Sequence, residues 1–192
     1  AIQTKLYNFT PVAQTDSTLL LRLKANNDSY IDFNYKLNKD SYLVDFTIQA
    51  KGMAPYLSQR NTIDIEWRHK ARQHERGFMY ENRLSRLTYK IDGGDFDHLS
   101  ESKNSEKEVE ENLKWVAFKN QFFSSVLIAD KNFQNSLLKS ENEAQGSGYL
   151  KDYSANLATT FDPSGKEATH LYLYLGPNHY KTLKSFNQTQ GE

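Results

Sequence analysis

Apolar and polar residues alternate along several stretches of this sequence, and that alternation constrains the fold more than any other feature. In Ile31–Leu37 every second residue is apolar, with Asp32, Asn34 and Lys36 between them. In the next stretch Tyr42, Val44, Phe46 and Ile48 share one face, and Asp45, Thr47 and Gln49 lie on the other. Successive side chains of a β-strand point to opposite faces of a sheet, so both stretches are predicted to be strands with one polar face. The intervening Asn38–Ser41 has the composition of a hairpin loop, which indicates an antiparallel pair.

Further strands are predicted by the same pattern. They are Thr18–Ala25, Ile63–Arg68, Leu87–Ile91, Tyr149–Phe161 and Thr169–Leu175. Sheets with one polar face are usually antiparallel, and many short strands in sequence favour two stacked sheets. We therefore predict an all-β antiparallel sandwich.

The most apolar stretch is Trp115–Asp130. A membrane span needs about 20 apolar residues in a row, and polar residues interrupt this stretch at Lys119–Gln121 and again at Ser124–Ser125. Its apolar residues come in blocks that are rich in aromatic and β-branched types, which favours strands over a helix. We predict two buried strands, or one bent strand, with a polar kink at Lys119–Gln121.

Three segments depart from the strand pattern. Ser100–Asn112 is highly charged and is predicted to be a solvated loop or a short surface helix. Ser140–Gly148 is predicted to be a flexible loop. After Gly176 and Pro177, a helix is predicted from Asn178, because Asn can cap it and Tyr180, Leu183 and Phe186 form an apolar stripe.

Composition excludes several functions. The 192 residues fit one domain with a sizeable core. The 24 basic and 24 acidic residues cancel, so we predict no nucleic-acid partner. The absence of cysteine excludes disulfides, thiolate metal sites and cysteine nucleophiles.

Two short motifs contain residue types that bind metals, but neither has the spacing that a known metal site requires. His69 and His74 are five residues apart, whereas the zinc-protease motif needs two His four apart on a helix, so a solvated basic loop is favoured. Asp92, Asp95 and Asp97 lack the positions of a calcium-binding loop, so a glycine turn between strands is favoured. With no nucleophile elbow, phosphate loop or dinucleotide fingerprint, we predict no catalytic residue, metal or cofactor.

The segments Lys114–Asp130 and Leu171–Leu183 together resemble the large periplasmic domain of the YidC membrane-protein insertases. The Trp-Val-Ala opening, the aromatic pair seven residues on, and a Gly-Pro that ends the last strand before a helix follow the order of that family. The resemblance covers most of the chain. Its structural core motif consists of Trp115, Phe118, Phe122, Phe123, Gly176 and Pro177.

The resemblance implies a β-supersandwich similar to galactose mutarotase, with a short C-terminal helix. Residues 1–192 would be a single periplasmic domain, a fragment that lacks the family's first strands and all transmembrane helices. The full-length protein would be a multi-pass protein of the bacterial inner membrane. The domain would be a non-enzymatic accessory to insertion and folding of membrane proteins, with SecYEG, SecDF and nascent membrane proteins as partners.

Two surfaces are candidates for contact with partners or the membrane. Tyr180, Lys181 and Lys184 belong to the predicted terminal helix, and Glu106, Glu108 and Glu110 belong to the charged segment. The alternative function is that of a carbohydrate-binding or mutarotase-like protein of the same fold, in which a His pair and a carboxylate would act as acid and base. None of the five His residues lies in a matching motif, and a plain binding module is the third option.

Overall fold

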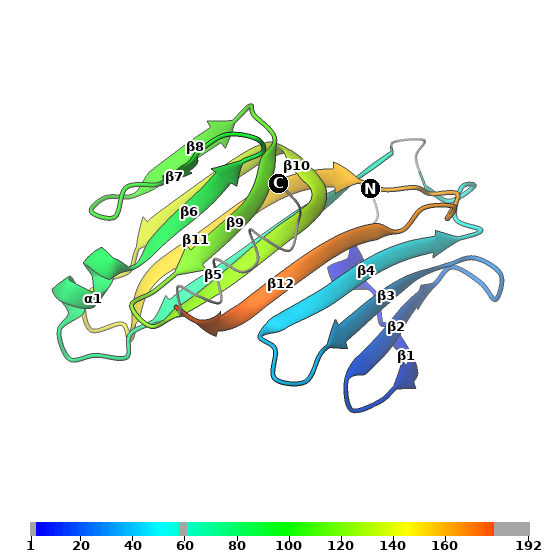
Figure 1. The fold of residues 1–192 in the computed structure, drawn as a ribbon, viewed down its shortest axis with the longest axis horizontal. Helices are drawn as coiled ribbons and strands as arrows, with labels where there is room; N and C mark the ends of the chain where they lie inside the picture. Colours follow the sequence, from blue (N-terminus) through cyan, green and yellow to red (C-terminus); the bar gives the residue numbers. More distant parts are fainter. Residues whose placement is uncertain (1–2, 58–60, 179–192) are drawn as a thin grey trace.

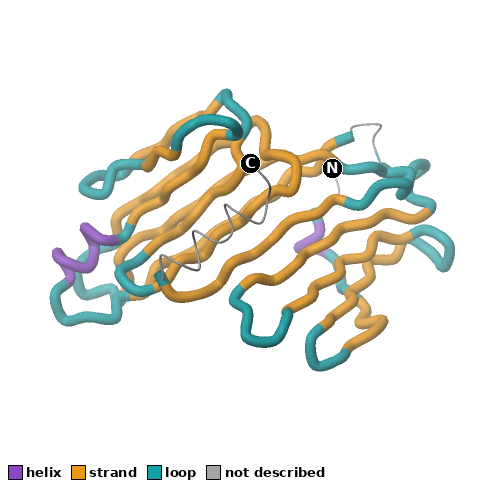
Figure 2. Tube along the Cα trace, in the orientation of Figure 1, coloured by secondary structure: helices purple, strands orange, loops and turns teal. Residues whose placement is uncertain are grey.

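The structure is a computed structural model that describes residues 3–57 and 61–178. Almost all of its regular secondary structure is strand (Figure 2). In chain order the elements are η1 (Thr4–Leu6), β1 (Thr10–Gln14), β2 (Thr18–Lys24), β3 (Tyr30–Leu37), β4 (Leu43–Lys51), β5 (Thr62–Arg72), α1 (Phe78–Leu84), β6 (Arg86–Ile91), β7 (Phe96–His98), β8 (Ser105–Val109), β9 (Leu113–Lys119), β10 (Phe123–Asn142), β11 (Tyr149–Thr160) and β12 (Thr169–Pro177).

The strands form two antiparallel sheets that share β10 (Figure 1). The larger sheet has the order β1-β2-β3-β4-β12-β10-β9-β6-β7. In the smaller sheet, β10 pairs with β8 and β11, and β11 pairs with β5. The predicted all-β antiparallel sandwich is confirmed, and so is the antiparallel pairing of β3 with β4.

One long strand connects the two layers. Residues 123–129 of β10 pair with β12 in the larger sheet, and its last residues pair with β8 and β11 in the smaller sheet. Between these halves the pairing with β9 slips in register after Ile128, and Asn135 adopts a φ of 48°. Such irregularities bend a strand. The bend lets β10 leave one layer and enter the other.

The main core lies between the two sheets, and an aromatic stack marks its middle. Phe118 of β9 is 2% exposed. Its ring lies 4.1 Å from that of Trp67 on β5 and 5.2 Å from that of Tyr153 on β11. Stacked rings contribute about 0.5–1.5 kcal/mol beyond the area that they bury. This cluster therefore holds the larger sheet against the smaller one.

Every predicted strand is present, with ends shifted by a few residues. The stretch Trp115–Asp130 is an antiparallel hairpin of β9 and the first half of β10, as predicted. The polar kink is its turn. There the Asn120 side-chain oxygen accepts hydrogen bonds from the backbone N–H groups of Phe122 (3.0 Å) and Phe123 (2.7 Å). The sequence did not predict β1, β7, β8 or α1.

The prediction for Ser100–Asn112 is wrong, because this segment contains β8, which pairs with residues 136–140 of β10. Its Val109 is 4% exposed, whereas Glu106, Lys107 and Glu108 are exposed. An edge strand keeps its backbone hydrogen bonds while charged side chains remain in water. The predicted loop at Ser140–Gly148 is correct only from residue 143, since β10 continues to Asn142. The predicted C-terminal helix lies outside the described residues, except for Asn178.

Candidate functional site

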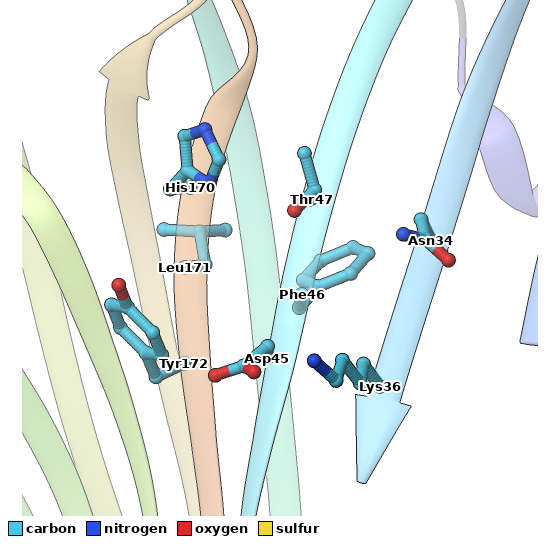
Figure 3. A pocket seen from close by; sticks show the side chains of 8 residues that line it. All are labelled: Asn34, Lys36, Asp45, Phe46, Thr47, His170, Leu171 and Tyr172. Atoms are coloured by element: carbon cyan, nitrogen blue, oxygen red, sulfur yellow. The ribbon is translucent and has the colours of Figure 1, made fainter. Parts of the chain in front are cut away.

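A polar depression of about 300 Å³ lies on the face of the larger sheet that points away from the smaller sheet, called the outer face below (Figure 3). Strands β3, β4 and β12 contribute its walls. The lining residues are Asn34, Lys36, Asp45, Phe46, Thr47, His170, Leu171 and Tyr172. Figure 3 shows Phe46 and Leu171 behind the strands, with the polar side chains on the near side.

Strand alternation and register place the polar side chains of this depression. Thr47 of β4 lies between Asn34 on β3 and His170 on β12, which are its partners across the two ladders. The same register places Asp45 between Lys36 and Tyr172. The residues that alternate with them, such as Phe46 and Leu171, contribute to the main core. The depression is thus two polar rows across three strands.

The chemistry of the depression suits binding better than catalysis. No hydrogen bond or ion pair links these six polar side chains to another residue in the described parts of the chain. They therefore offer hydroxyl, amide, ammonium and carboxylate groups to a small polar ligand. Asp45 and His170 are diagonal neighbours across the ladder, a relation that separates residues by roughly 7–8 Å. A direct proton transfer between them needs a much shorter distance.

A second apolar cluster lies beside the depression on the outer face. It is formed by Ala117, Val126 and Tyr174, with Leu43, Trp115 and Ile128 packed against them. Successive side chains of β9 point to opposite faces of the larger sheet. Val116 and Phe118 therefore contribute to the main core, whereas Trp115 and Ala117 contribute to the outer-face cluster. Trp115 is thus partly buried on the outer face and does not contribute to the core between the sheets.

Two residues of the predicted core motif are not in a core. Phe122 is 41% exposed and Phe123 is 52% exposed, so the prediction that both are buried is wrong. They lie at the turn of the hairpin and at the first residue of β10, where the sheet ends. Phe118, four residues before Phe122 in the chain, is 2% exposed.

Gly176 and Pro177 end β12 and determine how two tyrosines pack. A Cβ on Gly176 would lie 2.7 Å from Cγ of Tyr42 and 2.9 Å from Cζ of Tyr174, closer than real Cβ contacts. The missing side chain therefore leaves room for the two rings, whose centroids are 6.3 Å apart. The Tyr174 hydroxyl donates a hydrogen bond to the Pro177 carbonyl (2.6 Å).

Asn178 connects the end of β12 to the turn between β9 and β10 through hydrogen bonds. Its backbone N–H donates to the Phe122 carbonyl (2.7 Å), and its side-chain Nδ2 donates to the Asn120 carbonyl (2.8 Å). Its side-chain oxygen accepts a hydrogen bond from Ser124 Oγ (2.5 Å). The predicted contact residues that follow, Tyr180, Lys181 and Lys184, lie outside the described residues.

The acidic residues Glu106, Glu108 and Glu110 form an exposed row on and just after β8. Between them, Lys107 Nζ donates hydrogen bonds to the hydroxyl of Tyr89 (2.6 Å) and to Asp97 (3.0 Å). The hydrogen bonds that Asp97 accepts from Lys107, from the His98 backbone N–H and from the Tyr89 hydroxyl lower its pKa to about 2. The charged segment is thus fixed to β6 and β7 by defined contacts.

The two histidines of the basic segment have structural surroundings. The ring of His69 stacks on Phe118 (6.1 Å) and Tyr153 (6.5 Å), and its burial lowers the pKa of its imidazole. The backbone N–H of His74 donates to the carboxylate of Glu81 (3.1 Å), a side chain that is completely buried. Within residues 3–57 and 61–178, no three His, Asp or Glu side chains converge as a metal site would require.

Residues Asp92–Asp95 form the turn of the β6–β7 hairpin, with Gly93 at a φ of 69°, so the predicted glycine turn is confirmed. The polar depression is the part that the sequence did not reveal. The sequence pattern does place its polar residues on the solvent-facing side of each strand. Their convergence depends on the pairing of β4 with β12, which are far apart in the sequence.

Two antiparallel sheets that share one bent strand, with a polar depression on the outer face, define an all-β sandwich domain. The YidC periplasmic domain matches residues 4–190 of the chain, which therefore belongs to that family. The chain is 53% identical over its whole length to the membrane protein insertase YidC of Bacteroides fragilis, of which it covers 31%. It is 51% identical to the YidC of Phocaeicola vulgatus over 93% of the chain, and 31% identical to that of Porphyromonas gingivalis over 97%.

The chain spans about a third of the length of these relatives. In the described residues, none of the helices has the length and apolar character that a membrane crossing requires.

Proposed function

We propose that this chain is the accessory periplasmic domain of a membrane-protein insertase, and that it assists the insertion and folding of inner-membrane proteins without catalysing a reaction. The match of residues 4–190 to the YidC periplasmic domain carries the proposal. The identity of 53% with a protein named as an insertase supports it. The sandwich would act as a rigid body that presents surfaces to other molecules.

Nascent membrane proteins are the proposed substrates of the full-length protein, and SecYEG and SecDF are its proposed partners. The proposed location is the periplasmic side of the bacterial inner membrane. The relatives are named as membrane protein insertases, which supports a substrate that enters a membrane. The assignment of SecYEG and SecDF rests on the resemblance alone.

The proposed coupling to the rest of the insertase runs through the end of β12. Asn178 is hydrogen-bonded to the turn between β9 and β10, so the end of β12 is held against that turn. In the predicted helix from Asn178, the apolar stripe of Tyr180, Leu183 and Phe186 would pack on the sheet. Lys181 and Lys184 would then point towards lipid headgroups or neighbouring protein.

Complementation of an insertase-depleted strain by the full-length protein tests this proposal. We expect Leu183→Pro to impair growth, because a proline inside a helix costs about 3 kcal/mol or more. The matched control Leu183→Ala removes the same side chain and remains compatible with the predicted helix. A triple change of Glu106, Glu108 and Glu110 to Gln should have a smaller effect. Normal growth with the proline variant would contradict the coupling.

The second candidate function, binding of a carbohydrate, is favoured by the polar depression. A sugar hydroxyl can pair with Asn34, Asp45 and Lys36, and the Tyr172 ring offers an apolar surface. We expect no mutarotase activity, since His170 and Asp45 are not in hydrogen-bond contact. Interconversion of aldose anomers above the buffer rate, lost in His170→Ala or His179→Ala, would overturn this expectation.

A further inference from the structure

Five large apolar side chains are exposed together at one end of the larger sheet. We call them the strand-end patch: Leu37, Tyr42, Phe122, Phe123 and Leu175. Each is between 41% and 53% exposed. The ends of β3 and β12 and the start of β4, which carry part of this patch, lie along the lower edge of the larger sheet in Figure 1.

Backbone pairing holds the parts of the strand-end patch side by side. The Leu175 N–H donates a hydrogen bond to the Tyr42 carbonyl (2.9 Å), which connects the end of β12 to the start of β4. The Asn178 N–H donates to the Phe122 carbonyl (2.7 Å), which connects the other side of β12 to the hairpin turn. Phe123 follows in the chain. The five residues therefore lie on neighbouring strands and turns at one end of the larger sheet.

The area of the strand-end patch limits what it can bind. Five large side chains at about half exposure leave on the order of 400–500 Å² of surface. A patch of this size on a monomer is often functional. A stable complex between two proteins, including a second copy of this chain, needs roughly 800 Å² on each side. The area suits a shallow contact better than a tight protein interface.

The chemistry around the patch suits the surface of a bilayer. Tyr42 and Phe122 lie in turns, the other three residues lie within three residues of a strand end, and three of the five are aromatic. Lys39 in the β3–β4 turn and Lys119 at the end of β9 are exposed beside them, and Asp40 is the carboxylate of the same turn. Aromatic rings flanked by lysine are the combination that settles at the headgroup level of membranes.

We propose that the strand-end patch is a lipid-contact surface, in which Phe122 and Phe123 enter the headgroup layer while Lys39 and Lys119 meet lipid phosphates. This inference rests on the proposed function, because the name of the relatives places the full-length protein at a membrane. The hydrogen bonds of Asn178 connect the end of β12 to the turn that carries Phe122. The patch would therefore help to set how the domain sits on the bilayer.

Flotation of the chain with vesicles of phosphatidylethanolamine and phosphatidylglycerol tests the proposal. We expect the double variant Phe122→Asp/Phe123→Asp to bind at least about tenfold more weakly than the parent, because two apolar side chains no longer leave water. The chain has no cysteine, so Asn38→Cys in the same exposed turn can carry a single environment-sensitive dye. Its emission should shift to the blue on vesicles in the parent background and stay unchanged in the double variant.

A matched control removes the same kind of side chain elsewhere. Val12 on β1 and Phe96 on β7 are 46% and 69% exposed and lie on the two edge strands of the larger sheet. We expect Val12→Asp/Phe96→Asp to float like the parent. Thermal unfolding of both double variants confirms that the fold is retained, since each removed side chain is at least 41% exposed.

Failure of the parent to float, or equal binding by the two double variants, overturns the lipid contact. Binding of the patch to an apolar polypeptide but not to vesicles also overturns it, in favour of a protein partner. Growth complementation by the unmodified full-length protein tests the proposed function separately. A chain that complements growth without binding vesicles would leave the insertase role intact and remove only the lipid-contact surface.

Discussion

The body and the tip of the β9–β10 hairpin differ in how deeply their phenylalanine side chains are buried. Phe118 in the body is 2% exposed and stacks on rings from the smaller sheet. Phe122 and Phe123 at the tip are 41% and 52% exposed. The three residues have the same side chain, so the difference arises from the second layer, which covers the body of the hairpin and not its tip.

The comparison teaches that an aromatic residue stabilises the sandwich where the second sheet covers it and is available for contacts where the sheet ends. Strand β9 buries side chains on both of its faces, and the two faces pack in different clusters. Phe118 packs between the sheets, whereas Trp115 packs in the smaller outer-face cluster. Substitution should therefore lower stability most at Phe118, less at Trp115 and least at the tip of the hairpin.

Phe118→Ala should have the largest effect. Removing a completely buried Phe costs about 3–5 kcal/mol through lost burial and the cavity that remains. For a domain of this size the melting temperature should fall by roughly 10 °C. Thermal and urea unfolding measure the change. A fall of only a degree or two would mean that the stack with Trp67 and Tyr153 does not hold the sheets together.

Trp115→Ala should lower stability by less, about 2 kcal/mol, because the indole is partly buried and packs on one face of a single sheet. Trp115→Phe is the matched control, since it keeps an aromatic ring in the outer-face cluster. Unfolding curves of the two variants decide the matter. A parent-like melting temperature for Trp115→Ala would assign this residue a role in binding.

The sequence could predict the strands of the hairpin but not the exposure of its ends. The alternation of apolar and polar residues indicates which face of a strand is apolar, and it correctly predicted β3, β4 and β12. Phe122 and Phe123 are as hydrophobic as Phe118, so their composition contains no sign that the sheet ends there. That information comes from how far the smaller sheet extends.

The same limit explains the other misses. In β8, Glu106, Lys107 and Glu108 remain in water while the backbone pairs with β10, so side-chain composition could not indicate a strand. The polar depression requires His170 to lie beside Thr47, a pairing that no local pattern predicts. Local residue patterns thus identify elements, and long-range register creates sites.

His69 allows the body of the hairpin to be tested by pH. Its burial lowers the pKa of the imidazole, although the charge of Asp152 opposes the shift. The unfolded imidazole gains a proton near pH 6.5, whereas the folded one does so only at lower pH. In that window the unfolded state binds more protons, so stability is lost as pH falls below about 6.5.

The variant His69→Phe keeps the stacked ring and removes its titration. Urea unfolding near neutral pH and again at about pH 5 should show a smaller loss of stability for the variant than for the parent. The other histidines are common to both proteins, so the difference between the two pH profiles isolates His69. Identical profiles would mean that this ring is solvated when the chain is folded.

Phe122→Ser/Phe123→Ser should have the smallest effect on stability. Substitutions of exposed residues usually change stability by no more than about 0.5 kcal/mol each, and both side chains already contact water over roughly half of their surface. The turn itself should persist, because its hydrogen bonds come from the Asn120 side chain and from backbone groups. Phe96→Ser on the edge strand β7 provides the control at 69% exposure. A loss that approached that of Phe118→Ala would show that the tip is covered in solution, and the strand-end patch would then not be free to contact lipid.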